Sequence, residues 1–158
     1  MKTLPQLVKG GKHAYGWSEV SATGKVAIPD EALVDYNLTP PCKVFLFSGS
    51  KRSGGFAVTT ASLLENSVLS RRLDENPRLN SFQLPEGEVI TIAGKPYCWV
   101  TLNTDGYITI PLKTLKQYGV HAGDRLLSVR GSCFALAFCV KGPIIEEAKK
   151  HSNLTLLE

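Results

Sequence analysis

The three histidines and four cysteines are the residues of this chain whose side chains most readily do catalysis or bind metal. His13, His121 and His151 lie far apart, and none has a serine, cysteine or glutamate partner at motif spacing. A hydrolytic triad needs a nucleophile, a base and a group that orients the base. The cysteines, none of them in Cys-x-x-Cys spacing, are Cys42, Cys98, Cys133 and Cys139. We therefore expect structural thiols, no enzyme activity, no metal and no cofactor.

A glycine- and serine-rich segment, residues 48–55, carries two adjacent cations, Lys51 and Arg52. Glycines expose backbone N–H groups, and such groups can cradle a phosphate. The segment is not a nucleotide P-loop, because Gly54 is followed by Gly55-Phe56 rather than by lysine and serine or threonine. Two interpretations stay open at this point, a hairpin tip or a loop that contacts phosphate.

Other cations extend this set toward a nucleic-acid surface. Lys12 and Lys95 follow glycines in equivalent turns, and Lys25 stands beside another glycine. Phosphate contacts dominate affinity for DNA and need several cations on one surface. The alternative is that these lysines are solvated turn residues that keep the protein soluble. The net charge of +4 permits nucleic-acid binding but is mild.

The elements that would position these residues occur twice, at an offset of 82 residues. Tyr15-Gly16-Trp17 returns as Tyr97-Cys98-Trp99, and residues 23–29 return as residues 105–111. The period is too long for a solenoid, and there are only two copies. We infer one compact body built from two related halves.

Each half has the same expected order of elements. Alternating and β-branched residues predict strands, and the proline after the second strand predicts a short helix. A further strand pair and a helix, over 61–75 in the first half and 143–151 in the second, complete each copy. The polar residues 76–80, with Pro77 expected to stop the first of these helices, mark the junction between halves 1–79 and 80–158.

The composition is that of an ordinary globular protein, with 158 residues, 43% hydrophobic and 20% charged. No apolar run approaches the roughly 18 residues that span a bilayer. The N-terminal residues lack the apolar core of a signal peptide. We expect a cytoplasmic protein without membrane contact.

The repeated pattern resembles the AbrB/MazE/SpoVT superfamily. The closer copy runs from Gly-Tyr-Ile-Thr-Ile-Pro at residues 106–111 through a short helix to Gly-Asp-Arg at 123–125. The other copy lies in the first half and begins with residues 24–29. It has Pro41-Cys42 in place of the later Gly-Asp. Two such units in one chain also resemble the MraZ arrangement. The resemblance implies a swapped-hairpin β-barrel, in which two short units interlace their strands and bind DNA.

We therefore expect a mainly β fold with short helices, a pseudo-two-fold duplicated swapped-hairpin β-barrel with a helix at the end of each half. Each unit alone has too few strands to close its own sheet edges, and interlacing removes those edges. The two halves are expected to form one pseudo-dimeric domain.

In that family, DNA contacts come mainly from basic residues. Some follow the glycine that opens the strand before Ile-Pro, and others lie on the short helix after the proline. The first position corresponds to Lys25 in one half and Tyr107 in the other. The helix positions in the second half correspond to Lys113, Lys116 and Gln117. In the first half they correspond to Glu31, Val34 and Asp35, which would repel phosphate or leave it uncontacted.

The leading hypothesis is a DNA-binding transcriptional regulator of AbrB-like type that can also form a homo-oligomer. The expected DNA contacts are Lys12, Lys25, Lys51, Arg52, Lys95, Lys113 and Lys116. A protein-interaction or assembly module on the same barrel is the alternative that the acidic first helix favours. A small-ligand sensor is a third alternative, and it would need a pocket between the barrel and the terminal helices.

Overall fold

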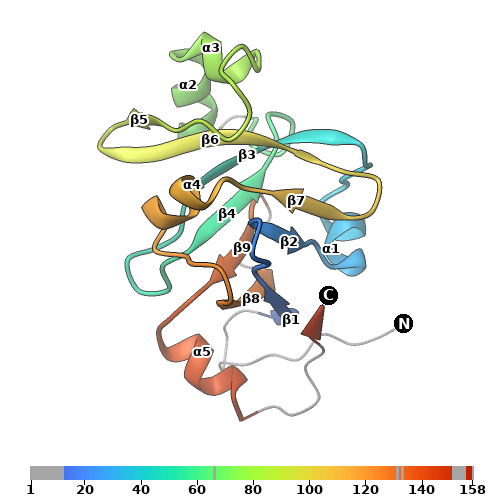
Figure 1. The fold of residues 1–158 in the computed structure, drawn as a ribbon. Helices are drawn as coiled ribbons and strands as arrows, with labels where there is room; N and C mark the ends of the chain where they lie inside the picture. The colour runs from blue at the N-terminus through green and yellow to red at the C-terminus, as the bar shows by residue number, and fades with distance from the viewer. Residues whose placement is uncertain (1–12, 66, 131, 133, 151–155, 158) are drawn as a thin grey trace.

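The computed structural model describes residues 13–65, 67–130, 132, 134–150 and 156–157, which form ten strands and five short helices (Figure 1). The strands are β1 (His13–Glu19), β2 (Lys25–Ala27), β3 (Cys42–Ser48), β4 (Phe56–Thr59), β5 (Ile90–Ile92), β6 (Lys95–Leu102), β7 (Tyr107–Thr109), β8 (Arg125–Arg130), β9 (Leu136–Cys139) and β10 (Leu156–Leu157). The helices are α1 (Asp30–Asp35), α2 (Val68–Asp74), α3 (Pro77–Asn80), α4 (Leu112–Gln117) and α5 (Pro143–Ala148).

The strands form one sheet that curls into a nearly closed barrel. Its order is β10-β1-β8-β9-β4-β3-β6-β7-β2, with β5 paired to the first three residues of β6. All pairs are antiparallel except β10, which lies parallel to β1. A tight turn returns β2 to β1, with the N–H of Ser21 donating to the carbonyl of Lys25 at 3.1 Å. The prediction of a mainly β barrel with short helices is confirmed.

Five pairings join a strand that precedes residue 80 to a strand that follows it. They are β1–β8, β3–β6, β2–β7, β4–β9 and β1–β10. Each half therefore completes its sheet with strands from the other half, and only the β3–β4, β5–β6, β6–β7 and β8–β9 pairs stay within one half.

In two of these pairings the central residue lies opposite its own repeat equivalent, as at a two-fold axis. Val26 lies opposite Ile108, 82 residues away, and Ala57 lies opposite Ala137, 80 residues away. The drop from 82 to 80 means that the β3–β4 loop is two residues longer than the β8–β9 loop. The basic segment around Lys51 therefore has no full counterpart in the second half.

Apolar side chains from both halves fill the barrel. The rings of Phe56 and Phe138 stack at 5.1 Å across the β4–β9 pair, and Tyr118 packs against Phe56 at 5.9 Å. Burying such rings removes large apolar surfaces from water, which is the dominant favourable term in folding. The interior thus depends on residues that lie far apart in the sequence.

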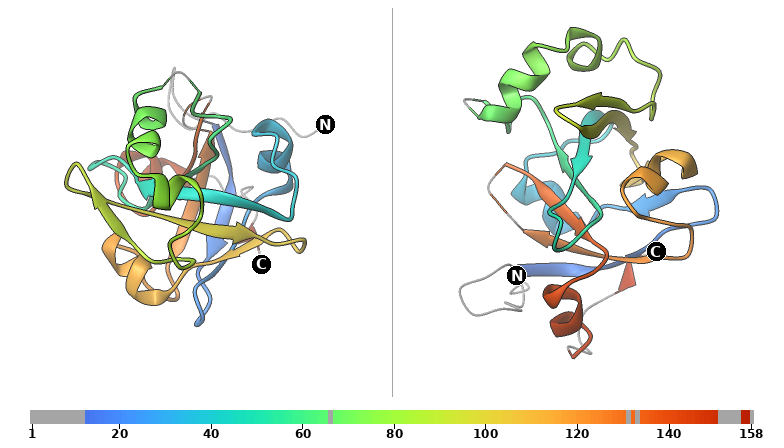
Figure 2. Two further views of the ribbon diagram at one scale, coloured as in Figure 1. Left: turned by 90° about the horizontal axis from the view of Figure 1, so that it is seen from above. Right: turned by 90° about the vertical axis from the view of Figure 1, so that its left-hand side faces the viewer.

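Helices cover the outside of the barrel differently in the two halves. The segment with α2 and α3 covers β3 and β6 (Figures 1 and 2), where the Trp99 indole donates a 2.7 Å hydrogen bond to the carbonyl of Leu84. On the other side, Ile144 and Ile145 of α5 pack over Leu127 and Val129 of β8. These two covers bury the outer sides of β3, β6 and β8 where these residues pack.

The linking segment differs from its sequence-based prediction. The helix predicted over 61–75 is shorter and begins at Val68, capped by the Ser67 hydroxyl, which accepts from the N–H of Ser70 at 3.2 Å. Val68, its first residue, is 67% exposed. Pro77 follows the end of α2 but also starts α3, where its missing N–H leaves no bond unmade. Leu79 of this polar stretch is fully buried.

Candidate nucleic-acid interface

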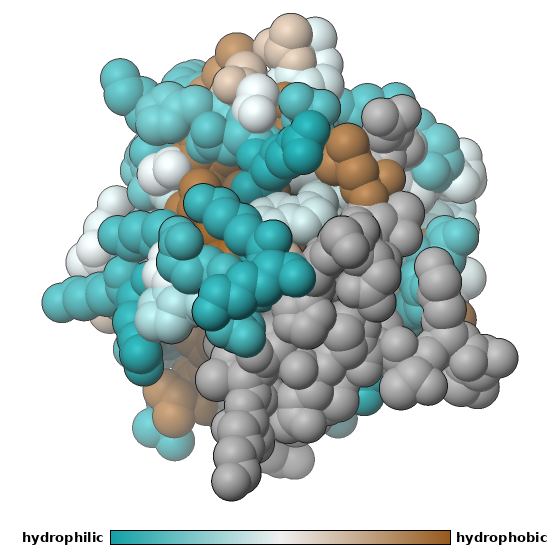
Figure 3. Space-filling model, turned by 90° about the horizontal axis from the view of Figure 1, so that it is seen from below, coloured by the Kyte–Doolittle hydropathy of each residue, from teal (hydrophilic) through white to brown (hydrophobic). Residues whose placement is uncertain are grey.

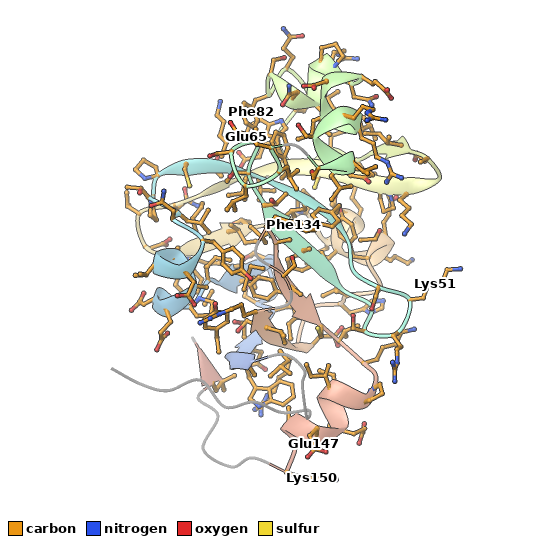
Figure 4. The ribbon with its side chains drawn as sticks, turned by 180° about the vertical axis from the view of Figure 1, so that it is seen from behind. Lys51, Glu65, Phe82, Phe134, Glu147 and Lys150 are labelled. Carbon is orange, nitrogen blue, oxygen red and sulfur yellow. The ribbon has the colours of Figure 1, made fainter. Side chains whose placement is uncertain are left out.

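Five of the seven predicted DNA contacts lie on three elements that project from one side of the molecule. These elements are the β3–β4 loop, the β5–β6 turn and α4, on the left in Figure 1 and toward the viewer in the right-hand view of Figure 2. The five side chains are exposed, and they are Lys51, Arg52, Lys95, Lys113 and Lys116. Figure 4 shows Lys51 pointing away from the body of the protein. We call this surface, with its five cations, the basic side.

The cations of the basic side are not paired with carboxylates in the described part of the chain. Among the residues that the structure describes, none of the five forms an ion pair. Their charges are therefore not compensated locally, and phosphate groups would not have to displace a protein carboxylate to reach them.

Helix α4 holds two of these cations on its outer side. Leu115 is fully buried and Thr114 nearly so, and the Thr114 hydroxyl donates a 2.6 Å hydrogen bond to the carbonyl of Gly87. Residues three apart lie on the same side of a helix, so Lys113 and Lys116 are neighbours. Because Thr114 and Leu115 anchor the opposite side of α4, both lysines lie in solvent. The neighbours of Gly87 in the chain are Glu86 and Glu88, which bring negative charge near the start of α4.

The β3–β4 loop is held in place by hydrogen bonds and by close contact with the second half. The N–H of Gly54 donates to the carbonyl of Ser50 at 2.8 Å, and the hydroxyls of Ser50 and Ser53 are 2.8 Å apart. The N–H groups of Val140 and Lys141 both donate to the carbonyl of Ser53, at 2.9 and 3.0 Å.

The second half approaches this loop so closely that glycine is required at the contact. A Cβ on Gly142 would lie 2.4 Å from the carbonyl oxygen of Arg52. The same contact brings in a cation that the sequence did not suggest. Lys141 is exposed, and its side-chain stem runs beside Gly54. Nothing in the sequence links Lys141 to a loop about 90 residues earlier, because only the β4–β9 pairing brings them together.

Lys25 does not belong to the basic side as a free cation. Its ammonium lies 3.2 Å from the Asp105 carboxylate and 4.5 Å from the centre of the Tyr107 ring. The Tyr107 N–H donates to the Asp105 carboxylate at 3.0 Å, and this bond together with Lys25 lowers the pKa of Asp105. The two positions that correspond in the halves, Lys25 and Tyr107, therefore contact each other. Lys12 lies outside the described residues.

A shallow cavity of about 500 Å³ adjoins Lys25 and Tyr107. Its wall includes Ala122 and Gly123. The repeat equivalents of these two small residues are Pro40 and Pro41 in the first half. Residues of both halves line the cavity, but the equivalent place in the other copy of the repeat carries prolines in place of these two small residues.

The first helix carries the opposite charge to α4 and is tied to the other half. The Asp35 carboxylate accepts a 2.6 Å hydrogen bond from the Tyr15 hydroxyl and a 2.7 Å bond from the Arg130 guanidinium. Tyr15 reaches it because a β-bulge between Ala14 and Gly16 turns this side chain to the inner side of β1. Burial and the bond to Asp35 raise the pKa of Tyr15.

The residues that could do other chemistry are dispersed. Cys98 and Cys139 are buried, Cys42 is half-buried, and Cys133 lies outside the described residues. Burial raises the pKa of Cys98 to about 11, which disfavours the reactive thiolate. Within the described ranges, no three His, Cys, Asp or Glu side chains are grouped so that they could hold a metal ion.

The comparison of the chain with known protein families and with curated proteins finds no match. No helix in the described part of the chain is long and apolar enough to cross a membrane.

Proposed function

We propose that this chain is a DNA-binding transcriptional regulator of AbrB-like type, acting in the cytoplasm, that contacts the DNA backbone through the basic side. The observation that carries the proposal is the gathering of Lys51, Arg52, Lys95, Lys113 and Lys116 on one side, without ion pairs in the described structure. Lys141 adds a sixth cation beside the β3–β4 loop.

Binding of this kind is electrostatic first. Each phosphate that a lysine or arginine neutralises releases condensed counterions, so log K falls with log salt by about 0.9 per contact. Contacts by all five cations of the basic side would give a slope of about −4 to −5. Base contacts would come from side chains that reach a groove once the backbone contacts have fixed the register.

The test is fluorescence anisotropy of a labelled duplex, with wild type and a Lys113→Glu/Lys116→Glu variant, across a series of salt concentrations. We expect the variant to bind at least about tenfold more weakly at low salt and to show a slope smaller by about 2. Both lysines are exposed, so the substitutions should leave folding intact.

The control variant leaves all five cations of the basic side unchanged. Lys149→Gln/Lys150→Gln changes two lysines of the α5 end that already pair with Glu146 and Glu147 at 3.5 Å. This control should bind duplex like wild type. The proposal fails if wild type does not bind duplex at low salt, or if the control loses as much affinity as the variant.

A protein-interaction or assembly module on the same barrel is the second candidate. Helix α1 favours it, because it exposes Val34, at 80%, beside the carboxylates of Asp30 and Glu31. An acidic and apolar surface repels phosphate but suits a protein partner. Wild type that fails to bind duplex but forms a stable complex or oligomer would favour this candidate.

A further inference from the structure

Three large apolar side chains are exposed among the described residues, and two of them lie on the repeat-equivalent helices. Val34 of α1 is 80% exposed and Leu112 of α4 is 46% exposed, while Val68 lies on α2. Single exposed apolar residues are normal on protein surfaces, and Figure 3 shows such residues scattered among hydrophilic ones. What singles out Val34 and Leu112 is the charge around each.

The two apolar residues are flanked by opposite charges. On α1, Asp30 and Glu31 are exposed near Val34, and on α4, Lys113 and Lys116 are exposed near Leu112. None of these four charged side chains has an ion-pair partner within the described structure. Each helix therefore presents the complement of the other, an apolar residue with acids against an apolar residue with bases.

We propose that copies of this chain associate head to tail, with α1 of one copy packed against α4 of the next. Asp30 and Val34 are four residues apart on α1, as Leu112 and Lys116 are on α4. If the two helices run antiparallel with Val34 against Leu112, Asp30 therefore lies beside Lys116. Glu31 and Lys113 flank this contact. Charge complementarity selects this partner, since α1 against α1 would place acids on acids and α4 against α4 would place lysines on lysines.

The position of the two helices determines the kind of assembly. They lie on opposite sides of the barrel (Figures 1 and 2). A head-to-tail contact between different surfaces leaves one free α1 and one free α4 at the ends, so it continues into a chain or closes into a ring. The mass in solution therefore rises beyond that of a dimer as the concentration rises.

The contact is small, and the association is correspondingly weak. Two helices of six residues bury less than the roughly 1,000 Å² that a stable interface needs. Surface ion pairs add little and are screened by salt, whereas the Val34–Leu112 contact is not. Raising the salt concentration should weaken the assembly without abolishing it.

Assembly and DNA binding both use α4. A copy whose Lys113 and Lys116 face the α1 of a neighbour cannot offer them to phosphate, so duplex DNA should dissociate the assembly under the function proposed above. Self-association itself is measured without DNA, and a failure of DNA binding therefore does not affect it.

The experiment is sedimentation velocity over a concentration series, with two charge-reversed variants and their mixture. The α1-basic variant is Asp30→Lys/Glu31→Lys, and the α4-acidic variant is Lys113→Glu/Lys116→Glu. Each alone carries the same charge on both helices, so we expect each to associate at least about tenfold more weakly than wild type. Their equimolar mixture pairs opposite charges at both contacts and should regain association.

The apolar contact has its own matched pair of variants. Val34→Ser should weaken association about tenfold, whereas Val68→Ser, at another exposed valine outside the contact, should leave it unchanged. The proposal is overturned if wild type stays monomeric at all concentrations. It is also overturned if assembly stops at a dimer, if the mixture of charge variants fails to associate, or if the two valine variants behave alike.

Discussion

Helices α1 and α4 occupy equivalent places in the two halves, but only the side of each helix that faces the barrel is similar. Ala32 and Tyr36 of the α1 region are buried as are Thr114 and Tyr118 of the α4 region. On the outer side, Glu31 corresponds to Lys113. The duplication has kept the residues that close the barrel, while the exposed residues have diverged to opposite charge. The fold is therefore pseudo-symmetric, whereas the exposed surface is not.

The same contrast holds where each helix meets the rest of the protein. Asp35 of α1 is bound by Tyr15 and by Arg130 from the other half, whereas its equivalent Gln117 is exposed and has no comparable bond in the described structure. The following substitutions exploit such equivalent positions, so that each half serves as a control for the other.

The largest difference is expected between two equivalent glycines. Both have positive φ, +86° at Gly24 and +83° at Gly106, but their surroundings differ. A Cβ on Gly24 would lie 2.0 Å from the carbonyl oxygen of Ile110, whereas one on Gly106 would lie 4.0 Å from that of Ile28. We expect Gly24→Ala to destabilise the protein by at least about 3 kcal/mol and Gly106→Ala by about 1–2 kcal/mol. Urea unfolding measures both, and equal losses would contradict the observed asymmetry.

The next difference concerns alkaline pH. Burial raises the pKa of the Cys98 thiol from 9.0 to about 11, and its repeat equivalent is Gly16, which has no ionisable side chain. Because the folded-state pKa is the higher one, this contribution to stability is complete below pH 9 and is lost as the pH rises through about 11. The loss should reach about 2 kcal/mol near pH 10.5.

The control for this effect is Cys98→Ala, which removes the thiol. Between pH 7.5 and about 10.5, its free energy of unfolding should fall less than that of wild type by about the same 2 kcal/mol. Burial also raises the pKa of Tyr118 and Tyr15, but these residues are present in both proteins and contribute to both curves. Curves of equal steepness would contradict the prediction.

A smaller loss is expected from the bond network of α1. Asp35→Asn removes the charge that the Arg130 guanidinium contacts at 2.7 Å, and Gln117→Ala makes a change at the equivalent position of α4. We expect about 1–2 kcal/mol for the first and less than about 0.5 kcal/mol for the second. A double-mutant cycle with Arg130→Gln isolates the pair, and a coupling energy near zero would show that the contact is not stabilising.

The smallest effect tests whether charge alone separates the two helices in DNA binding. The α1-basic variant gives α1 the charge of α4, and we expect it to bind nonspecific duplex about tenfold more tightly at low salt, about 1.4 kcal/mol. Anisotropy measures this gain. An unchanged affinity would mean that phosphate recognition depends on more than the sign of charge on these helices.

Much of the barrel could be predicted from the sequence because each strand or turn predicted in one half could be compared with its equivalent in the other half. The residues 23–29 and 105–111 gave matching strand and turn signals, and the glycines and prolines in them fix local geometry that propensity describes well. The segment between the halves has no repeat partner, so the buried Leu79 in a polar stretch was missed. Its burial depends on the outer side of β3 and β6, which no local pattern specifies.

The candidate site was predicted only in part, for the same physical reason. The position of Lys113 and Lys116 on a helix follows from spacing, but their place beside Lys51 and Lys95 depends on strand pairings between residues far apart. The ion pair of Lys25 with Asp105 crosses the β2–β7 pair and removes Lys25 from the free cations. Lys141 joins the basic side through the β4–β9 pair.

The most direct measurement is a lysine footprint, in which acetylation of each lysine is compared with and without bound duplex DNA. Our account predicts that DNA protects Lys51, Lys95, Lys113, Lys116 and Lys141, while Lys149 and Lys150 stay reactive. Protection of the α5 lysines instead, or no protection of α4, would contradict the assignment of the basic side as the surface that meets DNA.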